Sequence, residues 1–162
     1  MKRQEFNITV ENHSNSLYRF AVHFLKNQEE AEDIVQDVFE KLWINREKVE
    51  TDKVKSWLFT CVHNAMLNFI HKKARMIRLN DEIHGEKTEN STFGFESTQV
   101  INHIVGILPP VQKSIILLRD LEGYSYEEIG DIMSLSPSQV KVYLFRARLK
   151  IKKQLKGRNE LV

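Results

Sequence analysis

Apolar residues recur every three or four positions through the first half of the chain, with polar residues between them. This spacing places the apolar side chains on one face of a helix and predicts amphipathic helices. No stretch alternates apolar and polar residues between hairpin turn signals, so strands are not expected. We therefore predict an all-α fold. The three apolar stripes are Leu17, Phe20, Ala21, Phe24 and Leu25; Ala31, Ile34, Val35, Val38, Phe39, Leu42 and Trp43; and Leu58, Cys61, Val62, Ala65 and Phe69.

The helical pattern breaks in the middle of the chain, in the segment RMIRLNDEIHGEKTENSTFGFESTQ. This segment is polar, contains two glycines and has clustered Ser, Thr and Asn, which is typical of a linker. A short piece around Phe93 and Phe95 is a candidate for docking on a neighbouring surface. We predict two small helical domains, residues 1–75 and 100–158, joined by a flexible polar linker over residues 76–99.

Two helix starts follow each other closely in the second domain. Ser125 is followed three residues later by Glu128, and Ser136 by Gln139. Both pairs match the capping box that begins a helix, and the second also has a proline at the first helical position. A short helix, a tight turn and a long helix predict a helix-turn-helix. The two helices are expected at 125–133 and 137–156, with Ile129, Ile132, Val140, Leu144 and Ile151 facing inward.

The long second helix is the candidate DNA reader, because residues 139–158 hold eight bases and no acid. In a helix-turn-helix the second helix enters the major groove, and its first residues contact base edges. Arg and Lys can bond guanine, Gln can pair with adenine, and apolar groups can touch thymine methyls. Bases further along the helix are expected to meet phosphates. The alternative is an amphipathic basic helix with no DNA role. The candidate base readers are Ser138, Gln139, Lys141, Val142, Phe145 and Arg146, and the candidate phosphate contacts are Arg148, Lys150, Lys152, Lys153, Lys156 and Arg158.

Charge is also divided into blocks in the first half, although the net charge of the whole chain is only +2. Residues 28–52 hold nine acids and three bases, whereas residues 53–78 hold six bases and no acid. Two basic blocks in one chain predict two contacts with a polyanion, and the acidic block predicts contact with a different partner. The alternative is that each block is a solvated helix face. The polar stripe of the acidic helix is Asp33, Gln36, Asp37 and Glu40.

The basic helix of the first half combines aromatic rings, amides and basic side chains. This combination suits single-stranded nucleic acid, because rings stack on bases, amides read base edges and basic groups hold phosphates. The alternative for Trp57 is a place in the core. The candidate residues are Trp57, Phe59, Asn64, Asn68, His71, Lys72, Lys73 and Arg75.

Other features exclude several classes of function. The first residues carry charges without an apolar segment after them, and no apolar run is long enough to span a bilayer, so neither a signal peptide nor membrane insertion is expected. The only cysteine, Cys61, cannot form an internal disulfide and is expected in the core of a cytoplasmic protein. The six histidines show no metal-binding spacing. We therefore expect no metal, no cofactor, no small-molecule substrate and no enzymatic activity.

Three stretches, taken in order, resemble one family: NQEEAEDIVQDVFEKLW, KSWLFTCVHNAMLNFIHKKAR and LPPVQKSIILLRDLEGYSYEEIGDIMSLSPSQVKVYLFRARLKIKKQL. They look like the extracytoplasmic-function (ECF) group of the sigma-70 family, the promoter-recognition subunits of bacterial RNA polymerase. The resemblance covers roughly residues 6–75 and 100–156. It implies a sigma factor that binds core polymerase and directs transcription initiation through the −10 and −35 promoter elements. A helix-turn-helix regulator with an effector-sensing N-terminal domain is the alternative.

The resemblance implies a role for each surface. The acidic stripe would dock on the clamp helices of the largest polymerase subunit, the basic helix would capture a flipped −10 base with Asn64 at the base-reading position, and the long helix would read the −35 element. An anti-sigma factor is a further expected partner. Many family members carry Asp and Arg where this chain has Asn68 and His71, so their −10 preference does not transfer. The implied residues are Asp33, Gln36, Asp37 and Glu40 for polymerase; Asn64, Asn68, His71 and Lys72 for the −10 element; Ser138, Gln139, Lys141, Val142, Tyr143, Phe145 and Arg146 for the −35 element; and Arg148, Lys150 and Lys153 for phosphates.

The predicted linker limits how far the domains can separate. A flexible chain of about 24 residues has an r.m.s. span of roughly 25–30 Å, and its fully extended reach is about 80 Å. A promoter spacer of about 16 base pairs is roughly 55 Å long. The linker must therefore stretch to bridge the two elements, and we predict that the free protein packs its domains more closely than the DNA-bound form does.

Overall fold

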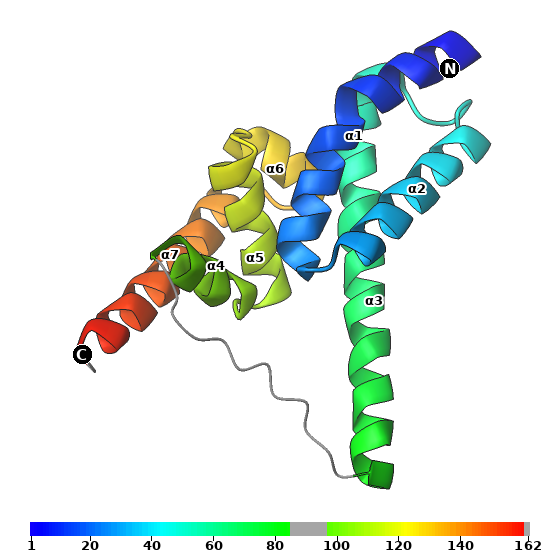
Figure 1. Cartoon of the computed structure of the whole chain (residues 1–162). Helices are drawn as coiled ribbons and strands as arrows, with labels where there is room; N and C mark the ends of the chain where they lie inside the picture. Colours follow the sequence, from blue (N-terminus) through cyan, green and yellow to red (C-terminus); the bar gives the residue numbers. More distant parts are fainter. Residues whose placement is uncertain (85–96, 161–162) are drawn as a thin grey trace.

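The structure, a computed structural model, describes the backbone of residues 1–84 and 97–160 and the side chains of residues 1–80 and 99–157. Every regular element in these ranges is helical (Figure 1), which confirms the predicted all-α fold. The helices are α1 (Arg3–Leu25), α2 (Gln28–Ile44), α3 (Val54–His84), α4 (Ser97–Gly106), α5 (Pro110–Ile116), α6 (Tyr126–Met133) and α7 (Pro137–Glu160). A 3₁₀ turn, η1 (Thr51–Lys53), precedes α3, and a π-helical turn, η2 (Leu117–Leu121), continues α5.

Helices α1, α2 and α3 form the N-terminal helical group. Helix α1 ends where Lys26 adopts a left-handed conformation with φ 57°. Helix α2 starts immediately afterwards, because the Asn27 side chain accepts a hydrogen bond from the backbone N–H of Glu30 at 3.1 Å. Most residues of the three predicted apolar stripes are buried or half-buried between these helices, and Trp43 at the end of α2 is the most exposed of them, at 37%.

Helices α4 to α7, with η2, form the C-terminal helical group, and both predicted capping boxes are present in it. The Ser125 and Glu128 side chains exchange hydrogen bonds with each other's backbone N–H, each at 3.1 Å. Ser136 and Gln139 do the same at 3.1 and 2.9 Å. The two caps set the starts of α6 and α7, so the predicted helix-turn-helix is confirmed. Of the residues predicted to face inward, Ile129, Ile132, Val140 and Leu144 are buried and Ile151 is half-buried.

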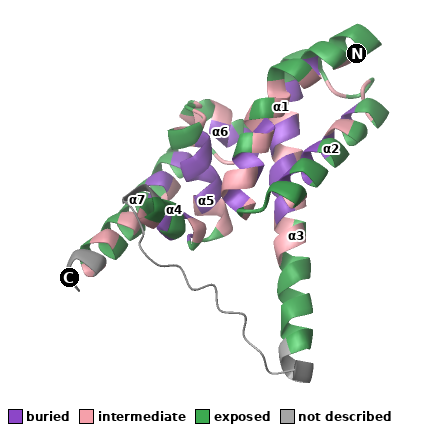
Figure 2. Cartoon of the chain, viewed as in Figure 1, coloured by how far each residue is buried: buried purple, intermediate pink, exposed green. Residues whose placement is uncertain are grey.

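The two helical groups pack directly against each other. Helix α3 lies against α6, and α1 lies against η2 (Figure 1). Buried residues from both groups form one continuous hydrophobic cluster, which Figure 2 shows where α1, α3, α5 and α6 meet. The described part of the chain is therefore in a closed arrangement, and the predicted difference from the DNA-bound form stays a prediction.

The expectation that helical structure ends near residue 75 is wrong. Helix α3 continues to His84, and its last part projects away from the rest of the molecule (Figure 1). Residues 71–80 are exposed, so this part of α3 has no buried face. It stays helical because residues 72–84 contain no Gly or Pro and include Met, Leu, Lys, Arg and Ala, which favour helices. The predicted docking segment at Phe93 and Phe95 lies outside the described residues.

Candidate nucleic-acid interface

Helix α7 presents an exposed face with both apolar and basic side chains. Phe145 is 66% exposed and Val142 is 47% exposed, although both belong to an amphipathic helix whose buried face holds Val140, Leu144 and Ala147. Large apolar side chains exposed on a capped helix are available for contact with a partner. The other predicted −35 contacts Ser138, Gln139, Lys141 and Arg146 are also exposed, and Tyr143 is half-buried.

Two of these side chains already have intramolecular roles. The amide oxygen of Gln139 accepts the hydrogen bond from Ser136 N–H that caps α7. This hydrogen bond fixes the orientation of the Gln139 amide, while the second lone pair of the oxygen and both amide N–H groups have no role in the cap. The guanidinium of Arg146 lies 5.9 Å from the centre of the Tyr143 ring, close enough for a cation–π contact that orients it. Tyr143 thus supports Arg146 from the half-buried side of the helix.

The predicted phosphate contacts lie further along α7. Lys150 and Lys153 are exposed, whereas Arg148 donates to Asp120 of η2 at 2.8 Å. Both side chains of this ion pair are about half exposed, at 52% and 49%, so it contributes little stability and can be exchanged for a phosphate. The side chain of Arg158 lies outside the described part of α7.

A second polar stripe runs along the exposed side of α3. Asn64, Asn68 and His71 are all exposed, and their spacing places them on one helix face. The same spacing continues through Arg75 and Arg78. A hollow of about 570 Å³ is lined by Asn68, His71, Lys72, Ala74, Arg75 and Arg78. Arg78 is absent from the residues predicted above, although continuing the spacing beyond residue 75 would have found it.

The two aromatic candidates of α3 differ from each other. Phe59 is fully buried, with its ring centre 5.6 Å from that of Phe20 and 5.3 Å from that of Tyr124. The prediction that Phe59 could stack on bases is therefore wrong, because core packing takes both sides of its ring. Trp57 is half-buried and borders a hollow of about 470 Å³ together with Lys41, Asn45, Lys48, Val49, Glu50 and Lys53.

Helix α2 carries the acidic stripe on the side opposite its buried face. Asp33, Gln36, Asp37 and Glu40 are all exposed. Gln36 and Glu40 also border an apolar hollow of about 580 Å³ with Phe6, Val10, Phe39, Trp43 and Ile44. Ile44 is 77% exposed. Acidic side chains beside an exposed apolar strip suit a protein partner better than nucleic acid.

Comparison with known proteins now identifies the family. The model of sigma-70 region 2 matches residues 9–76, and the model of sigma-70 region 4 matches residues 99–151. The chain is 29% identical to the ECF RNA polymerase sigma factor SigM of Bacillus subtilis, over 85% of this chain and 87% of that protein. It is also 29% identical to the RNA polymerase sigma factor SigV of Bacillus subtilis, over 85% and 83%.

The chain belongs to the ECF group of the sigma-70 family. Its function is therefore promoter-directed transcription initiation, and the alternative of an effector-sensing regulator is not favoured.

Two solved structures share the fold. The sigma factor RpoE of Bartonella quintana, solved with the anti-sigma factor NepR, is 26% identical, with a TM-score of 0.75 over 94% of this chain and 98% of that one. CnrH, solved with the cytosolic domain of CnrY, is 22% identical, with a TM-score of 0.72 over 96% of this chain and 90% of that one. The second likeness shows the fold alone.

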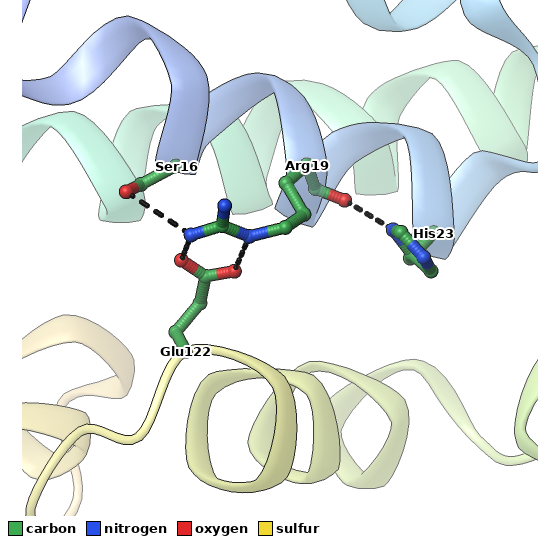
Figure 3. A network of polar contacts seen from close by, with 4 residues as sticks. All are labelled: Ser16, Arg19, His23 and Glu122. Atoms are coloured by element: carbon green, nitrogen blue, oxygen red, sulfur yellow. Dashed lines mark hydrogen bonds and ion pairs between the residues drawn. The ribbon is translucent and has the colours of Figure 1, made fainter.

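The sigma factor's two helical groups are joined by a bidentate ion pair that the sequence did not predict (Figure 3). Arg19 of α1 donates to both carboxylate oxygens of Glu122, the residue after η2, at 2.7 Å each, and Ser16 lies beside the guanidinium. The Glu122 side chain is only 1% exposed, whereas that of Arg19 is 45% exposed. The Arg19 guanidinium thus supplies the hydrogen bonds that water would otherwise give to this covered carboxylate.

A second set of polar contacts joins α3 to both ends of α6. The Lys55 ammonium donates to Glu128 at 2.6 Å and lies 3.8 Å from the centre of the Tyr124 ring. This lysine, together with the Ser125 backbone N–H, lowers the pKa of Glu128. At the other end of α6, the Thr60 hydroxyl lies 2.8 Å from the backbone carbonyl oxygen of Ile132. The first helix of the helix-turn-helix is thus held by the N-terminal group in the closed arrangement.

The remaining sequence expectations concern Cys61, metals and membranes. Cys61 is half-buried, and this burial raises the pKa of its thiol. Across the described residues, no three His, Cys, Asp or Glu side chains are grouped to hold a metal ion. None of the helices, within the range that the structure describes, has the length and apolar character needed to cross a membrane.

Proposed function

We propose that this sigma factor contacts three partners through three separate surfaces: core polymerase through α2, the −10 element through α3 and the −35 element through α7. The observation that carries this proposal is that two acid-free basic faces are both exposed on different helical groups, with an acidic face on a third helix. One basic face would be enough for a simple regulator. Two faces suit a protein that reads two separated DNA elements.

The −35 contact is proposed for the first half of α7. Lys141 and Arg146 supply donors for guanine, and Val142 and Phe145 supply apolar contacts for thymine. Ser138 and Gln139 lie at the helix start, where the capped end meets the groove, and Tyr143 orients Arg146. Arg148, Lys150 and Lys153 follow them as phosphate contacts, which position the helix without reading sequence.

The −10 contact is proposed for the stripe on α3. Asn64 would read a base taken out of the stack, while Asn68, His71 and Lys72 line the strand. Flipping a base costs a few kcal/mol, and only a base that fits recovers this cost, so recognition and strand separation are coupled. Arg75 and Arg78 extend the stripe and are proposed to hold backbone phosphates beyond it.

The acidic stripe on α2 is the proposed polymerase contact. Asp33, Gln36, Asp37 and Glu40 would dock on the clamp helices of the largest subunit, and exposed Ile44 offers an adjacent apolar contact. The role is binding rather than catalysis. The cytoplasmic location predicted from the sequence belongs to the same proposal, since polymerase and promoter DNA lie in that compartment.

We further propose that the closed arrangement is the inactive form of the protein. A packed pair of helical groups cannot reach two elements that lie roughly 55 Å apart along DNA, so we propose that the groups separate on the promoter. An anti-sigma factor is proposed as the partner that holds the closed form. Support comes from the likeness to the sigma factor RpoE of Bartonella quintana, which was solved with the anti-sigma factor NepR. The division into two domains remains part of this proposal, with the N-terminal domain extended beyond residue 75 by the rest of α3.

Run-off transcription with core polymerase tests the function directly. The purified chain should support initiation on a cognate promoter without any other sigma subunit, whereas a regulator would not. Asn64→Ala should leave polymerase binding intact and reduce open-complex formation, measured by permanganate reactivity of unpaired thymines. Asn7→Ala is the matched control, because Asn7 is exposed on α1 away from the stripe. Equal open-complex formation in both variants would remove Asn64 from the base-reading position.

A further inference from the structure

A buried histidine lies at the contact between the two helical groups. His63 of α3 is 6% exposed, and its Nδ1 is 2.7 Å from the hydroxyl oxygen of Ser114 on α5, which is fully buried. The edge of the contact is closed by Phe24 of α1, whose ring centre is 6.3 Å from that of His63 at an interplanar angle of 86°. The imidazole of α3 therefore contacts two further helices: α1 of its own group and α5 of the other group.

A buried lysine occupies the other side of Phe24. Lys113 of α5 is 9% exposed, its ammonium donates to the Phe24 carbonyl oxygen at 3.3 Å, and it lies 4.3 Å from the centre of the Phe24 ring. That carbonyl belongs to the last turn of α1, where helix carbonyls lack helical partners and the helix dipole is negative. The end of α1 thus already binds one cation from the C-terminal group.

Among the described residues, the charged groups at this contact are cations. Lys113, the residue before Ser114 on α5, packs against the same Phe24 ring as His63, and exposed Lys26 follows α1 and lowers the pKa of Lys113 in addition to the larger effect of burial. No ion pair of the described side chains joins a carboxylate to His63 or to Lys113. A proton on His63 would therefore add a second buried positive charge beside the first, without an anion to compensate it.

We propose that His63 makes the closed arrangement pH-dependent, so that the two helical groups separate as the solution becomes more acidic. This goes beyond promoter and polymerase binding and assigns the interface a response of its own. The geometry carries the proposal: a nearly fully buried imidazole at a separable interface shares the Phe24 ring with a buried lysine, and no ion pair of the described side chains supplies it with a carboxylate.

The direction follows from the two states of the ring. Burial lowers the pKa of His63 in the closed form, whereas in the separated form the ring meets water and has its ordinary pKa of about 6.5. Protons therefore bind the separated form more tightly. The contribution of neutral His63 to closure is complete above about pH 6.5 and is lost as pH falls below it, until the lowered pKa is reached. Between the two pKa values, the ratio of closed to separated molecules should fall about tenfold per pH unit.

Other ionisable groups of the interface can be distinguished from His63. The lowered pKa of Glu128 keeps its carboxylate charged through the window of about pH 5.5–7.5. His13 of α1 also has a pKa lowered by burial and by Lys55, but both residues belong to the N-terminal group and stay together when the groups separate. His63 is buried, and its hydrogen-bond partner Ser114 belongs to the other group, so opening exposes its ring to water.

The test uses the full chain, with small-angle X-ray scattering between pH 5.5 and 8 and NMR titration of the histidine rings. The wild type should be compact at pH 8 and expand as pH falls, with the midpoint of expansion matching the titration of the His63 ring. His63→Asn, whose amide nitrogen can take the place of Nδ1 toward Ser114, should lose this pH-dependent expansion while circular dichroism shows it folded. His23→Asn is the matched control for a histidine at the same interface that is not buried. The His23 ring contacts the Arg19 carbonyl of its own helix at 2.8 Å and borders a hollow shared with the C-terminal group, and the variant should expand as the wild type does.

Three results would overturn the proposal. The first is a His63→Asn variant that expands with the same pH dependence as the wild type. The second is a wild type that stays compact to pH 5.5, and the third is a wild type whose expansion and His63 titration have different midpoints. The last two are measured on the wild type alone, so they decide the matter even if the variant does not fold. None of these results affects the run-off assay at pH 8, so failure here leaves the proposed promoter function intact.

Discussion

Removing Arg19 should open the closed arrangement. Arg19→Ala deletes the bidentate partner of Glu122. In the closed form the Glu122 side chain is 1% exposed, so its carboxylate would remain buried without a cation. In the separated form water hydrates the same carboxylate, so the loss of Arg19 costs no free energy there. The substitution therefore destabilises only the closed form.

The size of the effect follows from the two exposed fractions. Breaking a fully buried ion pair by removing one partner costs about 3–5 kcal/mol. Here the Arg19 side chain is 45% exposed, so water already weakens the pair and can partly hydrate the carboxylate once the arginine is gone. We expect a cost of about 1–3 kcal/mol, which lowers the ratio of closed to separated molecules by roughly 5- to 150-fold.

The assay is the distance between spin labels on the two groups, measured by pulsed electron paramagnetic resonance in the Cys61→Ser background. The Arg19→Ala distribution should shift to longer distances, and Glu122→Gln combined with it should restore part of the closed population, because a neutral amide costs less to bury. Arg148→Ala is the matched control, since its 2.8 Å ion pair with Asp120 lies within the C-terminal group. An Arg19→Ala distribution identical to the wild type would refute the reasoning.

The other predictions concern the binding surfaces and the helix-turn-helix. Arg146→Ala should reduce the binding free energy on a cognate −35 duplex by about 1–3 kcal/mol and relax sequence specificity. Lys153→Ala should weaken binding to all sequences evenly and reduce the slope of log affinity against log salt by about one. Fluorescence anisotropy at several salt concentrations distinguishes the two variants, and identical behaviour would contradict the assignment. Asp37→Lys should weaken binding to core polymerase in a pull-down, whereas Glu11→Lys, at an exposed position of α1, should not. An equal loss of binding in both variants would show that the net charge of the chain, and not the α2 stripe, determines binding. Gly130→Ala should lower the thermal midpoint, because a β-carbon there would overlap the backbone oxygen of Leu135 in the turn after α6 and force a shift costing about 1–3 kcal/mol; an unchanged midpoint would show that the turn adapts freely.

Local features of the structure could be predicted from the sequence because they depend on residues close together in the chain. The Ser125–Glu128 and Ser136–Gln139 caps each span three residues, and their hydrogen bonds form as soon as a helix starts. The same holds for the exposed acidic stripe of α2 and the basic face of α7, since helical spacing alone decides which side chains share a face. The family resemblance rested on these same local patterns.

The tertiary structure alone decided how those helices bury or release their side chains. The sequence around Phe59 does not show whether its ring is buried or exposed. Packing against Phe20 and Tyr124, which lie on other parts of the chain, places it in the core. Arg19 and Glu122 are 103 residues apart, and His63 and Ser114 are 51 apart, so no local rule pairs them. Helix caps depend on backbone geometry within one turn, whereas burial and ion pairing depend on which distant surfaces meet, and that is settled only when the two helical groups fold together.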